Sequence, residues 1–336
     1  MPMLMRSMLC ALSAILALCT NAWAQAPIII KFSHVVAADT PKGKGAERFK
    51  ALAEKMTGGR VHVVVYANST LYSDKDEMEA LQLGAVQMLA PSLAKFGLLG
   101  MREFEVFDLP FLFADKEALH RVTNGPIGKN LFKRLESKGI IGLAYWDNGF
   151  KVMSANRPLI TPADFLGMKM RVQPSKVLDL QMRRLGASPQ VMAFSEVHRA
   201  LETGVVDGTE NPPSNLYTQN MHKVQKHLTV SNHGYLGYAV IVNKKFWDGL
   251  PAELRDQLNG AMREATNYSN AIAQQENERA LTLIRQSGLT TIHTLAEHDK
   301  AQWRRALLPL RTEVEARIGK ELIEAVEKES ATSDVR

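Results

Sequence analysis

Apolar runs and amphipathic stretches alternate in the first quarter of the chain, which is the pattern of an α/β fold. The run IIIKFSHVV is rich in β-branched residues and indicates a buried strand. Phe49, Leu52, Ala53 and Met56 then follow the i, i+3, i+4, i+7 spacing of one helix face. The predicted elements are a strand at 28–36, a helix within 39–59, a strand at 60–67, a helix within 73–84 and a strand at 85–91.

The same order of elements returns in the middle of the chain. It predicts a strand at 167–172, a helix at 175–186, a strand at 190–193, a helix at 195–204 and a strand at 205–212. The closing segments also align, since ALQLGAVQMLAPS and ALETGVVDGTENPPS share Ala, Leu, Gly and Val at matching places. Two similar lobes with mixed, mostly parallel sheets and right-handed crossovers are therefore expected.

The last third of the chain predicts a further strand at 234–247, then one helix from Pro251 to Gly288 and two amphipathic helices near Pro309. A helix of that length can span both lobes. We expect lobe I to contain 25–148 and 237–270, and lobe II to contain 149–236 and 271–330. A hinge and a ligand cleft should lie between the lobes.

The N-terminus has the features of a signal peptide. Arg6 precedes the apolar run MLCALSAILALC, and Ala22-Trp23-Ala24 fits the small-x-small cleavage rule. Segment 1–24 is therefore predicted to be cleaved after Ala24, which sends the protein to the periplasm. A lipoprotein is disfavoured because bulky Leu18 precedes the second cysteine. No later apolar run is long enough to span a bilayer, so we expect no membrane insertion of the mature chain.

Composition narrows the chemistry further. Both cysteines lie in the predicted signal peptide, so the mature chain cannot use disulfide or cysteine–zinc chemistry. The net charge of +6 favours anionic ligands, but Lys/Arg runs are missing and nucleic acid is not an expected partner. The nine histidines lack metal-ligand spacing, and neither H-E-x-x-H, G-x-S-x-G nor a P-loop occurs. We predict no metal, no cofactor and no catalytic residue.

Two residues are nominated by their place at strand ends. In open α/β sheets, ligands bind beyond the carboxyl ends of strands. Arg171 ends the first strand of the second series, before a turn fixed by Pro174 and Ser175, and suits bidentate capture of a carboxylate. Asn211 ends the third strand before Pro212, although an Asx-turn explains it equally well. The equivalent positions of the first series are Ser33, His34, Pro91, Ser92 and Lys95.

Several motifs together resemble one family. IKFSHVVAADTPKGKGAERFKALAEKMTGG, LQLGAVQMLAPS, MKMRVQPS, LGASPQVMAFSEVHRALETGVVDGTENP and VIVNKKFWDGLP are similar to the solute-binding proteins of tripartite ATP-independent periplasmic (TRAP) transporters. Within that family they resemble the DctP-type branch, which binds C4-dicarboxylates. The resemblance covers nearly all of the chain after residue 24.

The resemblance implies a non-enzymatic protein that closes two lobes around an organic acid such as succinate, malate or fumarate and delivers it to the small and large membrane subunits of a permease. Arg171 would form the salt bridge with the ligand carboxylate, and Asn211 is the asparagine of the family's ENP motif. Lys151 follows WDNGF, where an arginine is also common, and this departure leaves the partner of a second carboxylate open. Further candidates implied by analogy are Ser92, Lys95, His34, Lys44, Phe194 and Tyr235.

Three alternatives remain at this point. The same fold could bind a keto, aromatic or sugar acid instead. It could present its ligand to a sensory receptor rather than to a permease. An exported enzyme acting on organic acids would need a nucleophile or a tuned acid–base pair near Arg171, and the sequence offers none with recognisable spacing.

Overall fold

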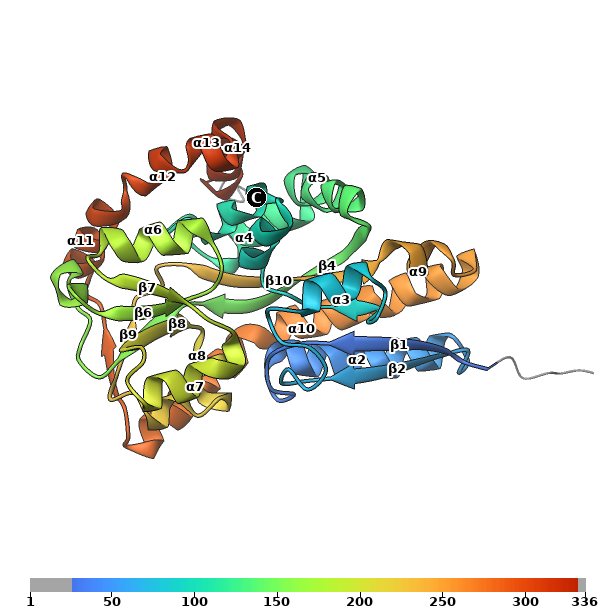
Figure 1. Cartoon of the computed structure of the whole chain (residues 1–336), viewed down its shortest axis with the longest axis horizontal. Helices are drawn as coiled ribbons and strands as arrows, with labels where there is room; N and C mark the ends of the chain where they lie inside the picture. The colour runs from blue at the N-terminus through green and yellow to red at the C-terminus, as the bar shows by residue number, and fades with distance from the viewer. Residues whose placement is uncertain (1–25, 332–336) are drawn as a thin grey trace, which may run out of the picture.

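The fold was analysed in a computed structural model that describes residues 26–331. The predicted signal peptide therefore lies outside the described residues. Figure 1 shows β1, β2 and α2 at one end of the molecule and β6, β7, β9 and α6 at the other. Each group belongs to a separate sheet flanked by helices, so the predicted two-lobe α/β fold with mixed sheets is confirmed.

The first sheet has the strand order β2-β1-β3-β10-β4. Its strands are β1 (Ile28–Ser33), β2 (Val61–Tyr66), β3 (Met88–Leu89), β4 (Ile140–Phe150) and β10 (Tyr235–Asn243). β1 runs parallel to β2 and β3, whereas β10 is antiparallel to β3 and β4. The parallel strands β1 and β3 both end at the same edge, which brings the residues after Ser33 and Leu89 together.

The second sheet has the order β11-β9-β5-β8-β6-β7. Its strands are β5 (Val152–Ala155), β6 (Lys169–Val172), β7 (Ser188–Val191), β8 (Gly208–Asn211), β9 (His227–Val230) and β11 (Thr291–Thr294). β6 is parallel to β7 and β8, and Arg171 pairs with Thr209 across β6 and β8. Arg171 and Asn211 therefore lie near the same carboxyl edge of this sheet.

Four strands lie where the sequence pattern predicts none, namely β4, β5, β9 and β11. β4 and β5 follow one another through Lys151, and the chain passes there from the first sheet to the second. β4 pairs antiparallel with β10, and β5 pairs antiparallel with β8 and β9. These pairings make both sheets mixed.

The α-helices carry the bounds α2 (Pro41–Met56), α3 (Glu77–Gln82), α4 (Lys116–Asn124), α5 (Pro126–Leu135), α6 (Lys176–Arg184), α7 (Phe194–Glu202), α8 (Pro213–Thr218), α9 (Lys244–Asp248), α10 (Ala252–Ser287), α11 (Glu297–Leu307), α12 (Leu310–Glu313), α13 (Glu315–Ile318) and α14 (Lys320–Ala331). The 3₁₀ helices are η1 (Leu93–Leu99), η2 (Arg102–Asp108), η3 (Glu136–Lys138), η4 (Pro162–Phe165) and η5 (Met221–Lys223). The two helices predicted near Pro309 are in fact four, because the chain turns at Val314 and at Gly319, which has φ +103°.

The 36-residue helix α10 contacts elements of both sheets, as predicted. Ser269 donates a hydrogen bond to the Pro41 carbonyl at 3.3 Å, and Asn270 accepts one from the Asp147 amide at 2.9 Å. Further along, Asn277 accepts a hydrogen bond from the Ser214 amide at the start of α8. Within residues 26–331, no helix is long and apolar enough to cross a membrane.

The C-terminal helices pack on elements of the first half of the chain. Leu310, Val314 and Ile323 share one hydrophobic core with Phe104 and Leu119. Figure 1 shows α13 and α14 beside α4. The predicted lobe II range 271–330 thus includes helices that lie against elements of predicted lobe I, and the lobe boundaries stay a prediction. The aromatic segment 104–113 contributes Phe104, Phe107 and Phe113 to this cluster.

Gly149 lies near the end of β4, just before the chain crosses between the sheets. It has φ +147°, and a Cβ built on it would lie 2.5 Å from Nδ2 of Asn277. We predict that Gly149→Ala lowers the free energy of unfolding by about 2 kcal/mol or more, because strain and a steric clash act together. Urea denaturation measures the change. Gly58→Ala, with φ +60° but no atom within 4 Å, is the matched control and should cost only about 1 kcal/mol. Equal losses in the two variants would contradict the predicted clash.

Candidate ligand-binding site

A narrow buried cavity lies between the carboxyl edges of the two sheets. Its volume is about 20 Å³, which is room for one water molecule. Residues from both halves of the fold line it: Val35, Val36, Lys42, Asp74, Ser92, Lys95, Leu236 and Tyr238 from one side, and Arg171, Gln173, Phe194, Asn211 and Asn215 from the other. Ser92 donates a hydrogen bond to Gln173 across the cavity. A ligand larger than water therefore requires the two sides to move apart.

Arg171 is the largest cation in the cavity wall and is 2% exposed. Its Nε and Nη2 donate to the Met192 carbonyl at 3.2 and 3.0 Å, and its Cζ lies 5.7 Å from the centroid of the Phe194 ring. Burial lowers the pKa of Arg171, although Asp74 and Glu210 oppose this shift. The guanidinium stays protonated in proteins, so it is a fixed positive charge. Among residues 26–331 no carboxylate forms an ion pair with it.

Asn211 and two neighbours supply neutral donors. Oδ1 of Asn211 accepts a hydrogen bond from Asn215 at 3.2 Å, while its Nδ2 is buried and has no acceptor in the described part of the chain. The Tyr238 hydroxyl accepts from Asn148 at 3.0 Å and from Asn215 at 3.3 Å. Because both amides donate to this oxygen, the hydroxyl proton of Tyr238 is left to donate to a ligand.

Lys95 lines the cavity, but its charge is already compensated. Its ammonium forms buried ion pairs with both Asp74 and Glu77. Burial lowers the pKa of Lys95, but the two carboxylates outweigh burial and raise it above its ordinary value. The ammonium is therefore compensated by protein carboxylates. They leave no positive charge over for a ligand.

Lys42 is a cavity residue that the sequence analysis missed. It is 1% exposed, its Nζ donates to the Ala90 carbonyl at 2.9 Å, and it lies 3.7 Å from the centroid of the Tyr238 ring. Burial, and then the charge of Lys95, lower its pKa to about 7. Glu77 and Asp74 oppose this shift, but no carboxylate in residues 26–331 forms an ion pair with Lys42. Lys42 and Arg171 are thus the two buried cations of the cavity without an ion-paired carboxylate.

Helix geometry explains why Lys42 lines the cavity and Lys44, in the same segment, does not. Residues two apart on an α-helix point to nearly opposite faces. In α2, Lys42 faces the cavity and Lys44 faces α10, where it forms an ion pair with Glu276 at 2.6 Å. The spacing of the two lysines could have shown that only one of them reaches a site, though not which one.

His34 and Tyr235 also lie away from the cavity. His34 is fully buried behind it and packs against Phe32, and burial, followed by the Lys42 charge, lowers its pKa to about 3. Tyr235 stacks edge-on against Phe150, with 5.0 Å between ring centroids. Side chains alternate along a strand, so Tyr235 and Tyr238 of β10 point to opposite faces of the sheet. Tyr238 takes the cavity face that the sequence analysis assigned to Tyr235.

Lys151 does not line the cavity. Its Nζ forms a buried ion pair with Glu210 at 2.7 Å, and the other carboxylate oxygen of Glu210 is 2.8 Å from Nε2 of His233. Burial raises the pKa of Glu210, but Lys151 and His233 outweigh it and lower this pKa to about 2. Glu210 precedes Asn211 in β8, so the two side chains point to opposite faces. Lys151 therefore neutralises a structural carboxylate.

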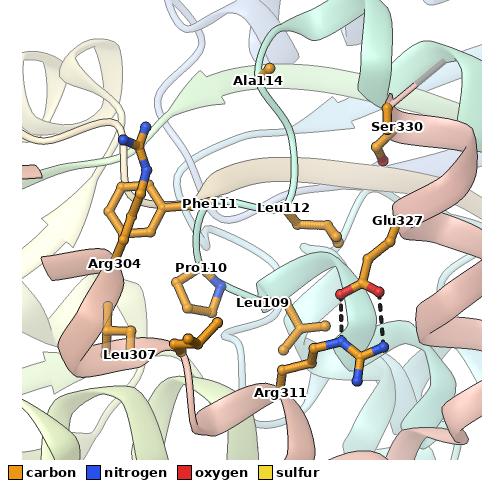
Figure 2. Close-up of a pocket in the computed structure, with 12 residues that line it drawn as sticks. Leu109, Pro110, Phe111, Leu112, Ala114, Arg304, Leu307, Arg311, Glu327 and Ser330 are labelled. Carbon is orange, nitrogen blue, oxygen red and sulfur yellow. Dashed lines mark hydrogen bonds and ion pairs between the residues drawn. The ribbon is translucent and has the colours of Figure 1, made fainter. Parts of the chain in front are cut away.

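A larger cavity of about 390 Å³ lies between the loop at 109–114 and the C-terminal helices, and Figure 2 shows its lining. Arg311 is bound there by both oxygens of Glu327, at 2.6 and 2.9 Å, and Arg304 lies 5.1 Å from the Phe111 ring. None of the predicted ligand-binding residues lines it. Both of its cations have carboxylate partners, since Arg304 also lies 3.8 Å from Glu297, so it offers a weaker anion site.

Two α/β lobes with buried cations between them are the arrangement expected of a protein that binds an anionic solute. The chain belongs to the bacterial extracellular solute-binding proteins of family 7, the DctP family, whose sequence model matches residues 32–317. The family resemblance predicted from the motifs is thereby confirmed. This is a family of solute-binding components of transporters.

Individual relatives agree with this assignment. The C4-dicarboxylate-binding periplasmic protein DctP of Rhodobacter capsulatus is 65% identical over 91% of this chain and 92% of its own. A TRAP periplasmic solute-binding protein from Shewanella oneidensis, crystallised with bound succinate, superposes with a TM-score of 0.89 at 42% identity, covering 91% of this chain and all of the other. A sugar acid binding protein from Advenella mimigardefordensis, in complex with galactonate, gives 0.88 at 33% identity over 90% and 98% of the two chains.

The buried ion pair predicts a structural effect for Lys151. Lys151→Met should lower the free energy of unfolding by about 3–5 kcal/mol, because it leaves the Glu210 carboxylate buried without its cation. The double variant Lys151→Met/Glu210→Gln removes both charges and should recover part of that loss. Chemical denaturation of both variants measures this. A stable Lys151→Met protein with weakened ligand binding would instead place Lys151 at the ligand.

Proposed function

We propose that this protein captures a C4-dicarboxylate outside the cytoplasm and delivers it to the membrane subunits of a TRAP permease. The observation that carries the proposal is the pair of buried cations without carboxylate partners, Arg171 and Lys42. Burying an unpaired cation is costly unless a counter-ion joins it. A ligand with two carboxylates supplies one counter-ion for each.

The relatives support this choice of ligand. The relative from Rhodobacter capsulatus is named for C4-dicarboxylates, and the solved relative from Shewanella oneidensis holds succinate. The galactonate complex, at lower identity, supports a sugar acid as the second candidate for the same fold. Lys42 favours the dicarboxylate, because a monocarboxylic sugar acid would leave one of the two cations without a partner.

In the proposed complex, Arg171 holds one carboxylate through the guanidinium N–H groups that do not donate to the Met192 carbonyl. Lys42 holds the other carboxylate. The Tyr238 hydroxyl and the free amide of Asn211 donate to the remaining oxygens. Ser92, Lys95 and Phe194 complete the cavity wall. Lys95 contributes indirectly, through its ion pairs with Asp74 and Glu77. Hinged closure of the two lobes removes water from these charges.

The proposal includes export and the absence of turnover. The segment 1–24 has the pattern of a cleaved signal peptide, and family membership supports a location outside the cytoplasm. We propose binding without catalysis, since transport requires the acid to leave unchanged. Prolonged incubation with succinate, malate and fumarate, followed by product analysis, tests this part. A sensory receptor in place of the permease is distinguished by loss of uptake when the gene is deleted.

Removing the guanidinium should abolish tight binding. We predict that Arg171→Ala weakens dicarboxylate binding at least ~30-fold, because a buried charge pair loses one partner. Arg171→Lys should also bind more weakly, because an ammonium cannot form two parallel hydrogen bonds with one carboxylate. Isothermal titration calorimetry with succinate measures both variants. Wild-type affinity in either one would remove Arg171 from the site.

The pKa of Lys42 predicts how binding depends on pH. With a pKa of about 7, Lys42 loses its proton in the free protein as pH rises, and a bound carboxylate raises this pKa again. Binding then takes up a proton above about pH 7, and affinity should fall by up to about tenfold per pH unit between about pH 7 and pH 9. Calorimetry in buffers of different ionisation enthalpy detects the proton. Lys42→Met, the matched control, should bind weakly with a flat pH profile, and a flat wild-type profile would contradict the role of Lys42.

A further inference from the structure

Helix α7 begins at the cavity without a capping side chain of its own. Its N-cap residue is Ala193, whose methyl group cannot accept a hydrogen bond, and no side chain at that position caps the helix. The first N–H groups of a helix need acceptors and favour a negative charge. The amide of Phe194, the first residue of α7, instead donates to Oδ2 of Asp74 at 2.5 Å. Asp74 lies 120 residues earlier in the chain and on the opposite wall of the cavity.

Asp74 is a fixed anion. Its second oxygen forms an ion pair with Lys95, and its side chain is only 10% exposed. Burial raises the pKa of Asp74, but Lys95, the Phe194 amide and Arg171 together outweigh burial and lower it below its ordinary value. The carboxylate therefore remains charged at neutral pH and is anchored on the side of the first sheet.

The start of α7 also touches the predicted ligand site. Met192, two residues before the helix, accepts both hydrogen bonds from Arg171, and the Phe194 ring lies over the same guanidinium. One short segment, 192–194, thus contacts Arg171 from its own side of the cavity and Asp74 from the other. Separation of the two walls must break the contact with Asp74, because Asp74 and α7 belong to different halves of the fold.

We propose that Asp74 is a positioning residue that caps α7 across the cleft and thereby determines how long a bound dicarboxylate is retained. This inference rests on the proposed function. Closure gives α7 the cap that Ala193 cannot supply, and it brings the Met192–Phe194 segment and Arg171 into place together. The contact contributes mainly after the ligand has entered, so its loss should increase the dissociation rate more than it changes the association rate.

Asp74→Asn is the variant that tests this. Asparagine has the same shape and keeps an oxygen for the Phe194 amide, but it removes the charge at the helix N-terminus. Lys95 retains Glu77 as a partner, so the variant should fold. We expect radiolabelled succinate to dissociate about tenfold faster, with an association rate within about threefold of wild type, since hydrogen bonds to charged groups are markedly stronger than neutral ones.

Lys75→Gln is the matched control. It breaks the ion pair between Lys75 and Glu196 of α7, in which the charged atoms are 3.0 Å apart. The two side chains are 64% and 50% exposed. Exposed pairs contribute little, so its dissociation rate should change less than about twofold. Melting curves of the ligand-free proteins provide the second measurement, because a merely structural role would lower the Tm of ligand-free Asp74→Asn and leave dissociation unchanged.

The outcomes separate the two claims. If wild type retains succinate and Asp74→Asn releases it at the wild-type rate, the capping role is wrong and the proposed function stands. If wild type binds a different acid in a ligand screen, the C4-dicarboxylate assignment fails, and the same dissociation assay with that acid decides the role of Asp74.

Discussion

The rest of the site depends on one buried guanidinium that the protein surrounds but does not neutralise. Arg171 rests on the Met192 carbonyl and the Phe194 ring, and the nearest acids are committed elsewhere: Asp74 to Lys95, and Glu210 to Lys151. Asp74 and Glu77 share the Lys95 ammonium, and Glu210 pairs with Lys151. The charge of Arg171 is thereby kept for an external anion, and burial makes that anion's binding strong and dependent on its geometry.

A hydrogen-bond network links the cavity to the point where the chain passes from the first sheet to the second. Asn277 of α10 accepts a hydrogen bond from the Ser214 amide at 2.9 Å and donates to the Asn148 carbonyl at 2.6 Å. Ser214 donates to the Asn148 side chain, which in turn donates to the Tyr238 hydroxyl. The donors of the cavity and the point where β4 leads into β5 therefore share one polar network. Movement of one lobe relative to the other necessarily alters the donors that face the ligand.

The sequence predicts features that depend on the order of neighbouring residues. It does not predict which face of a helix or strand a side chain occupies, or which distant residue it pairs with. The sequence nominates Arg171 and Asn211 because the strand ends before Pro174 and Pro212 are visible in it, and both residues line the cavity. Lys42, rather than Lys44, reaches the cavity because of the rotation of α2, which no single sequence reveals. The ion pair of Lys151 is not visible in the sequence, because its partner, Glu210, lies 59 residues away in another strand. The antiparallel strands β4, β5 and β9 depend on similar long-range pairing.

A crystal structure of the protein grown with succinate tests the central claim most directly. The account predicts one succinate in the cavity between the sheets, with one carboxylate on the Arg171 guanidinium and the other within reach of the Lys42 ammonium. Succinate bound elsewhere, with Arg171 still in contact only with Met192 and Phe194, would contradict it.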